Sequence, residues 1–176
     1  ARPNVELVTE GITGITAHGV TTDDGRHREV DSIIYGTGFA ATGFLQPMDV
    51  IGRDGADLQA QWAGGASAYR GVAVHGFPNL FVLYGPNTNL GGNSIIYMLE
   101  AQIGYISQAL GEMRRLDLAS IEVREDEESE FEAWVDAASR STAWVTNCHS
   151  WYTTNGRNTN NWPAQTIRYG RLMRHF

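Results

Sequence analysis

The chain has 176 residues and a formal net charge of −7, from 20 acidic residues against 13 basic ones. All 13 basic residues are arginines, which excludes mechanisms that need a lysine, such as Schiff-base chemistry or a phosphate-loop lysine. The acidic balance argues against nucleic-acid binding. A single cysteine, Cys148, can form neither an internal disulfide nor a cysteine zinc site.

The composition and the first residues indicate where the protein works. No apolar run approaches the roughly 18 residues that span a membrane. No basic segment followed by an apolar one marks a secretory leader. We therefore expect a cytoplasmic protein, and the start at Ala1, in the middle of a sequence pattern, favours a piece of a larger chain.

The first 36 residues predict a β-meander. Residues 5–8 and 12–17 are short β-branched or alternating runs. Residues 21–25 predict a turn, because Gly25 can take the positive φ that an Asp-Gly turn requires. A third short strand over residues 31–35 should end at the Gly36-Thr37-Gly38 segment.

The middle of the chain predicts a buried strand and a long helix. Residues 39–76 are irregular, with one short helix at about 57–62. Residues 80–84 form an apolar run bounded by turn residues, which predicts a strand buried on both faces, as in a parallel sheet. Apolar residues with a 3.6-residue period predict a helix over about 94–116, for which Asn93 or Ser94 suits the N-cap.

The last third predicts a strand, a helix and an irregular tail. The strand covers residues 121–124, and the helix covers about 127–141, beginning in an acidic run that suits a helix N-terminus. Five of the ten asparagines then lie between positions 147 and 161, without helical or strand periodicity. This tail either binds a ribose, an amide or a sugar, or is a surface loop anchored by a tryptophan.

Two glycine-bearing turns are candidate ligand sites. The loop 88–93 follows a predicted strand and precedes a helix, which is where α/β sheets present ligands, and Gly91 and Gly92 would let a flat ligand approach. The alternative is a tight connection. Gly36 and Gly38 indicate either a close approach to a cofactor or strand termination. The five histidines show no metal-ligand spacing, and no complete catalytic set appears.

Two separated motifs, in order, resemble those of flavin-dependent monooxygenases. Residues 31–39 (DSIIYGTGF) are similar to a signature of Asp, apolar residues and Ala-Thr-Gly-aromatic, with Gly36 in place of the alanine. Residues 77–87 (FPNLFVLYGPN) and 92–102 resemble the last strand of the FAD domain and its following helix. The tail, with Ser-Trp-Tyr at 150–152 and Asn-Trp-Pro at 161–163, is similar to the C-terminal part of Baeyer–Villiger monooxygenases.

The resemblance implies an α/β fold: the C-terminal half of a Rossmann-like FAD-binding domain, with a β-meander, one parallel-type strand, two main helices and a long irregular tail. It places the returning half of the FAD domain at residues 1–145 and a C-terminal lid at 146–176. It also implies FAD, NADPH and O2 chemistry, in which one oxygen atom is inserted into a ketone. The chain itself would supply no catalytic side chain.

The resemblance further implies a set of cofactor-binding residues. The loop from Asn87 to Ile95 would lie by the flavin ring, with the Ser94 and Ile95 N–H groups near its pyrimidine oxygen, and Trp151 would lie against NADP. Backbone donors at that place would stabilise negative charge on the reduced ring. The whole set is Thr37, Gly38, Asn87, Asn93, Ser94, Ile95 and Trp151.

Several family motifs are missing from the sequence, which leaves alternatives open. Neither of the two glycine fingerprints, for FAD and for NADP, occurs, nor does the active-site arginine region. We therefore expect the chain alone to bind FAD poorly and to be inactive. The alternatives are part of an N- or S-oxygenating flavin monooxygenase, or a degenerate interaction module that oligomerises through an exposed half-sheet.

Overall fold

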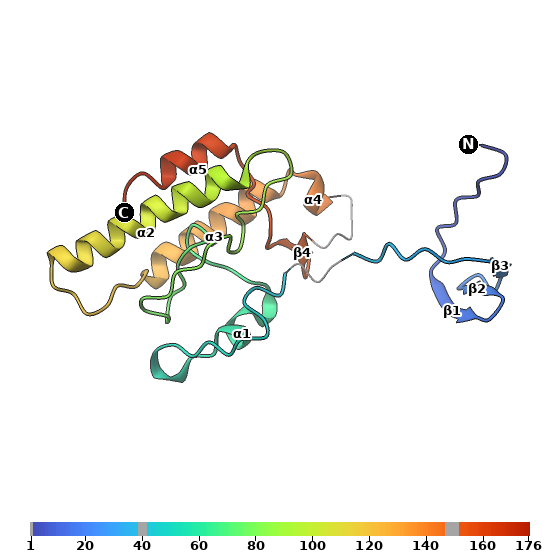
Figure 1. The fold of residues 1–176 in the computed structure, drawn as a ribbon, viewed down its shortest axis with the longest axis horizontal. Helices are drawn as coiled ribbons and strands as arrows, with labels where there is room; N and C mark the ends of the chain where they lie inside the picture. Colours follow the sequence, from blue (N-terminus) through green and yellow to red (C-terminus); the bar gives the residue numbers. More distant parts are fainter. Residues whose placement is uncertain (1, 39–41, 147–151) are drawn as a thin grey trace. The chain divides into compact units, whose positions relative to one another are not determined.

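A computed structural model describes residues 2–38, 42–146 and 152–176 of the chain (Figure 1). It contains two compact units, residues 1–38 and residues 39–176. Each unit is described below by itself. Among the described residues, no helix is both long and apolar enough to cross a membrane.

The first unit is an antiparallel β-meander. Its strands are β1 (Ile12–Thr16), β2 (Gly19–Thr22) and β3 (His27–Glu29), and they lie in the order β1-β2-β3. The turn between β2 and β3 is fastened by Asp24, whose carboxylate accepts hydrogen bonds from the Thr22 hydroxyl at 2.5 Å and the Arg26 N–H at 3.1 Å. The predicted turn at residues 21–25 is confirmed, and a meander does form in this part of the chain, but of its predicted strands only residues 12–17 correspond to an observed one, β1, and β2 and β3 were not predicted as strands.

The second unit is mainly helical. Its longest elements are α2 (Ile95–Arg115) and α3 (Glu125–Ser139), and the predictions of both helices are confirmed. The short helix α1 (Leu58–Gln61) begins where Asp57 caps it, also as predicted. The remaining elements are short: the 3-10 turns η1 (Arg53–Gly55) and η2 (Trp62–Gly64), α4 (Ala143–Thr146), the two-stranded β4 (Thr153–Thr154) and β5 (Arg157–Asn158), and α5 (Thr166–Leu172).

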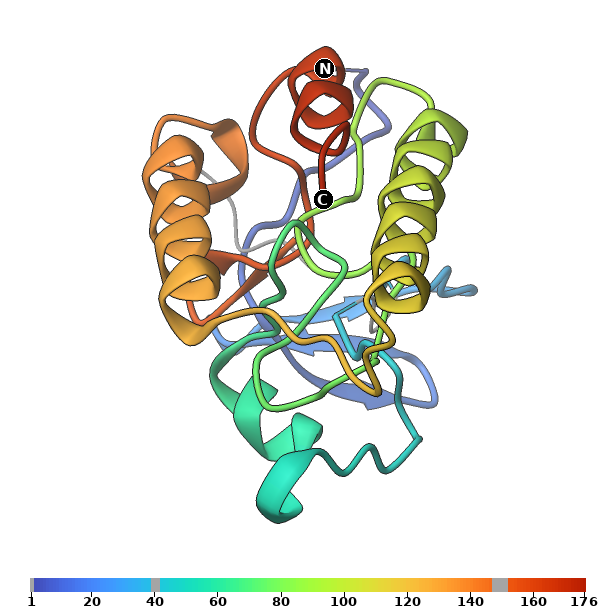
Figure 2. The same ribbon diagram turned by 90° about the vertical axis from the view of Figure 1, so that its left-hand side faces the viewer.

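The core of the second unit joins the C-terminal segment to the long helices. Helix α5 packs against α2 (Figure 1), and Figure 2 shows the segment between α1 and α2 running between α2 and α3. Trp162 and Tyr169 are buried in one cluster with Met98 and Tyr105 of α2, and Trp134 of α3 packs on it. A second cluster surrounds Leu58, Trp62 and Phe77. The boundary predicted at residue 145 stays a prediction.

Four predicted strands do not form ladders among the described residues. They are the segments 5–8, 31–35, 80–84 and 121–124. A strand needs a neighbour that continues a regular series of backbone hydrogen bonds, and within the described part of the chain these segments form at most isolated ones, such as that from the Val82 N–H to the Val72 carbonyl at 2.8 Å. The expectation that residues 80–84 are buried on both faces is also wrong, since Leu83 and Tyr84 are 47% and 45% exposed.

Candidate functional site

The loop that leads from residue 84 to α2 is held in a strained conformation. Tyr84 and Asn87 have φ angles of 57° and 59°, a left-handed region that non-glycine residues rarely occupy. Asn87 is buried, and its side-chain Nδ2 donates to the Asn158 carbonyl at 2.6 Å. Its backbone N–H donates to the Thr159 carbonyl at 3.2 Å. The C-terminal segment therefore fixes the shape of this loop.

Two glycines let a turn pack directly under the loop. A Cβ atom at Gly71 would overlap the Thr88 side chain, and one at Gly85 would overlap the Gly71 carbonyl oxygen. The Val82 N–H donates to the Val72 carbonyl at 2.8 Å beside this contact. Backbone thus lies on backbone here, which explains why small residues occur at both positions.

The asparagines of the tail bind the loop and one another. Asn89 Nδ2 donates to Asn161 Oδ1 at 2.6 Å, and backbone bonds pair residue 89 with residues 160 and 162. Asn158, which is 3% exposed, donates from Nδ2 to Ser139 Oγ and to the Asn161 carbonyl. Neither predicted alternative for this segment therefore describes Asn158 and Asn161, which are buried parts of the scaffold. Composition alone gave no signal for this pairing, because it joins residues about 70 positions apart.

The N-terminus of α2 is open to solvent. Gly91, Gly92, Asn93 and Ser94 are exposed, and a Cβ at Gly92 would meet nothing within 4 Å. The Ser94 N–H donates to Asn93 Oδ1 at 2.7 Å, and Ser94 Oγ accepts from the Tyr97 N–H at 3.4 Å as the N-cap. Of the two predicted backbone donors, Ser94 is thus already engaged. The N–H of Ile95 has no partner among the described residues.

The other predicted site residues lie in different parts of the chain. Thr37 and Gly38 belong to the first unit, where both are exposed and Gly38 has a φ of 80° with open space around it. Trp151 lies outside the described residues. Within residues 39–176, Asn87, Asn93 and Ser94 belong to the loop that leads to α2, and Ile95 is the first residue of that helix.

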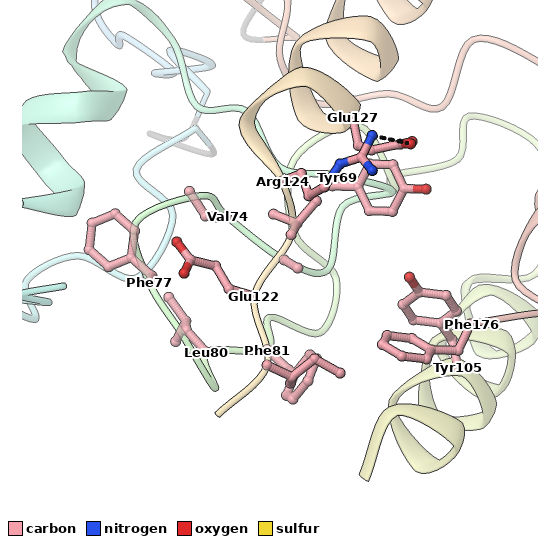
Figure 3. Close-up of a pocket in the computed structure, with 13 residues that line it drawn as sticks. Tyr69, Val74, Phe77, Leu80, Phe81, Tyr105, Glu122, Arg124, Glu127 and Phe176 are labelled. Atoms are coloured by element: carbon pink, nitrogen blue, oxygen red, sulfur yellow. Dashed lines mark hydrogen bonds and ion pairs between the residues drawn. The ribbon is translucent and has the colours of Figure 1, made fainter. Parts of the chain in front are cut away.

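A separate cavity of about 440 Å³ lies elsewhere in the second unit (Figure 3). Aromatic side chains make much of its wall. Arg124 and Glu127 also line it and form an ion pair with 3.2 Å between nitrogen and oxygen, drawn as a dashed line in Figure 3. None of the predicted cofactor-binding residues lines this cavity. Its aromatic members are Tyr69, Phe77, Phe81, Tyr105 and Phe176.

An ionic network beside this cavity ties α3 to the segment 75–76. Glu122 accepts a hydrogen bond from the Gly76 N–H at 2.6 Å and pairs with Arg53. Glu128 accepts from the His75 N–H at 2.6 Å, and burial raises the pKa of the Glu128 carboxyl. Glu128 belongs to the acidic run that begins α3, and it is buried where residues 125–127, 129 and 130 are exposed. No cluster suited to a metal ion occurs in the described part of the chain.

Comparison with known proteins relates the whole chain to monooxygenases. It is 44% identical to a Baeyer–Villiger monooxygenase of Pseudomonas aeruginosa over 100% of the chain and 34% of that protein. It is 42% identical to an FAD-binding monooxygenase of Aspergillus niger, over 94% of the chain and 28% of that protein. No protein-family model matches the chain.

Solved structures give the same relationship. A closed crystal structure of cyclohexanone monooxygenase is 30% identical, with a TM-score of 0.74, over 98% of this chain and 34% of that one. An oxidised steroid monooxygenase bound to NADP is 28% identical, also with a TM-score of 0.74, over 98% and 33%. These neighbours support the α/β class. The chain spans about a third of the length of the relatives it matches.

Proposed function

Since the chain belongs to the Baeyer–Villiger type of flavin monooxygenases, we propose that it forms one part of a longer enzyme that uses FAD, NADPH and O2 to insert an oxygen atom into a ketone. The part it supplies would be the C-terminal half of a Rossmann-like FAD domain with its C-terminal tail. The name of the cyclohexanone monooxygenase relative supports a small ketone as the substrate class.

One observation carries this proposal: a rigid, strained loop that ends at an open helix N-terminus. Asn87 is buried and fastened, whereas Gly91 and Gly92 a few residues later are exposed. A flat ligand can reach the backbone there, and the N–H of Ile95 with the partial positive charge of the helix end favours an electron-rich oxygen atom. The residues present therefore fit the pyrimidine edge of a flavin.

In this proposal the cofactor supplies the redox chemistry, and residues of the chain bind and orient it. FAD, when bound, supplies the redox chemistry with NADPH and O2. The Ile95 N–H would donate to the flavin oxygen and stabilise negative charge on the reduced ring. Asn93 would keep the Ser94 N–H engaged, and Asn87 would hold the loop in place. Thr37 and Gly38, in the first unit, stay predicted cofactor-binding residues.

The exposed apolar side chains support the idea of a half domain. Ile34, Leu83, Ile96 and Ile103 are between 47% and 96% exposed; the first two belong to segments that were predicted to be strands, and the other two lie on the long helix α2. Partner strands would come from the part of the relatives that this chain does not span. We therefore propose that residues 1–176 alone bind FAD weakly and do not catalyse the reaction.

The first test is the visible absorbance of the full-length protein that contains this chain. A copurifying flavin and ketone-dependent consumption of NADPH are expected. Oxygenation of amines or sulfides instead of ketones would favour the N- or S-oxygenating alternative. A colourless full-length protein that binds no added FAD would refute the proposal.

A sharper test addresses the backbone donor. Ile95→Pro removes the N–H at the first helical position, where proline is tolerated, and Ser94 already has the extended backbone that proline requires before it. We expect a more negative flavin potential and a loss of turnover of about tenfold or more. Ile95→Val, which keeps the N–H, is the control. If the flavin potential and the turnover are equal in Ile95→Pro and Ile95→Val, the Ile95 N–H does not bind the flavin.

Trp151 is tested in the same full-length protein. If its indole contacts NADP, Trp151→Ala should raise the NADPH concentration needed for half-maximal flavin reduction or increase uncoupled NADPH oxidation. Unchanged NADPH kinetics and coupling would contradict this assignment.

A further inference from the structure

We propose that Gln102 is a positioning residue that couples the C-terminal helix α5 to the candidate cofactor loop. This inference rests on the proposed function for its meaning in the reaction, although its geometry stands by itself. Gln102 lies on the buried face of α2, and its printed hydrogen bonds go to Tyr84 and Tyr169.

The Gln102 amide is completely buried and uses both of its ends. Its Oε1 accepts a hydrogen bond from the Tyr84 N–H at 3.0 Å, and its Nε2 donates to the Tyr169 hydroxyl at 2.9 Å. The Tyr169 hydroxyl donates in turn to the Arg70 carbonyl at 2.8 Å. Gln102 and Tyr169 are each 0% exposed, so water cannot replace a lost partner without opening the core.

Tyr84 is the residue at which positioning matters. Its left-handed backbone begins the turn that continues through Gly85 to Asn87, and such a conformation persists only where the surroundings determine it. Gln102 holds the Tyr84 backbone, and Asn89 accepts from the Tyr84 hydroxyl at 2.6 Å. The residue is therefore fixed at both ends immediately before the candidate cofactor loop.

At its other end, the series of hydrogen bonds reaches Arg70, which binds the C-terminal end of α5 and the residues after it. Arg70 donates from one guanidinium nitrogen to the Leu172 carbonyl at 2.9 Å and to the His175 carbonyl at 3.0 Å. The same guanidinium lies over the rings of Tyr69 and Tyr105, at 4.7 and 5.1 Å from their centroids. A shift of α5 would thus break the Tyr169–Gln102 bond and release Tyr84.

The experiment uses the full-length protein with bound FAD and compares Gln102→Met, Tyr169→Phe and the control Gln108→Met. Gln108 lies on the same helix but is exposed and bonds only within its own turn. Two quantities are measured: amide hydrogen exchange of residues 84–89, relative to that of α3, and the visible spectrum and midpoint potential of the flavin.

We expect Gln102→Met to accelerate exchange at residues 84–89 about tenfold relative to α3. Tyr169→Phe should act in the same direction, and both should shift the flavin bands and potential, while Gln108→Met changes neither. If Gln102→Met fails to fold, Tyr169→Phe decides the question, because it removes the hydroxyl that links Gln102 to Arg70 while the aromatic ring still fills the core.

Two results would overturn the inference. The first is that the variants fold and that their amide exchange at residues 84–89, flavin spectrum and flavin potential equal those of the wild type. The other is an acceleration that is equal in α3, which would show a merely structural role. If the wild-type protein holds no flavin, the proposed function is refuted, and so is the expected change in the flavin spectrum and potential. The amide exchange of residues 84–89 would then still decide whether Gln102 positions the loop.

Discussion

Replacing Asn158 by alanine removes a buried side chain with four hydrogen bonds in the tail. Its Nδ2 donates to Ser139 Oγ at 2.9 Å and to the Asn161 carbonyl at 2.8 Å, and its Oδ1 accepts from the backbone N–H groups of Asn161 at 2.9 Å and Asn160 at 3.3 Å. All four partners belong to the segment that holds the candidate cofactor loop, or to the end of α3.

The expected loss of stability follows from these four bonds. Each buried neutral hydrogen bond contributes about 1 kcal/mol, and a buried group left without a partner costs about 1 to 3 kcal/mol. Because Asn158 is 3% exposed and the contact to Asn160 is long, we expect Asn158→Ala to lower the unfolding free energy by about 3 to 4 kcal/mol.

Urea denaturation of the full-length protein, followed by tryptophan fluorescence, measures this loss, since Trp162 is buried close by in sequence. The control is Asn155→Gly, because Asn155 is exposed, has a φ of 52° that suits glycine, and makes a single side-chain bond of 3.3 Å to the Gly64 carbonyl. A loss below about 1 kcal/mol for Asn158→Ala, or one equal to the control, would refute the reasoning.

Two further predictions concern steric contact and pH. Gly71→Ala should destabilise the fold by about 2 kcal/mol more than Gly25→Ala, because both have left-handed backbones but only the first would overlap Thr88; thermal denaturation measures the difference, and equal losses would contradict it. Burial raises the pKa of the Glu128 carboxyl, so the folded protein binds this proton more tightly than the unfolded chain does. The free energy of unfolding should therefore fall as the pH rises from the ordinary glutamate pKa of 4.5 through the raised pKa of the folded state. Glu128→Gln keeps an acceptor for the His75 N–H and should flatten this fall in denaturation midpoints measured at stepwise pH; an unchanged slope would assign it to other groups.

The local features of this fold could be predicted from the sequence. The 3.6-residue period and Ser94 define α2, the acidic run marks the start of α3, and the Asp-Gly turn separates β2 from β3. The motifs at residues 31–39 and 77–87 also carried the family resemblance. Each of these signals lies within about 20 consecutive residues, where propensity, capping and turn chemistry act directly.

Only the tertiary structure decided how the candidate loop is held. The bonds of Gln102 to Tyr169 and of Asn87 to Asn158 join residues 67 and 71 positions apart, and the sequence contains no periodicity that pairs them. The apolar run 80–84 predicted a buried strand, but a strand and its burial depend on neighbours, and the described residues form no ladder with this run and leave Leu83 and Tyr84 exposed. The sequence of this acidic chain thus determined its two long helices, the turn at residues 21–25 and its family resemblance, but not α5, which lies in the tail predicted to be irregular. Long-range packing determined which polar side chains are scaffold and which backbone groups remain open, because burial is a property of the assembled fold and not of any segment.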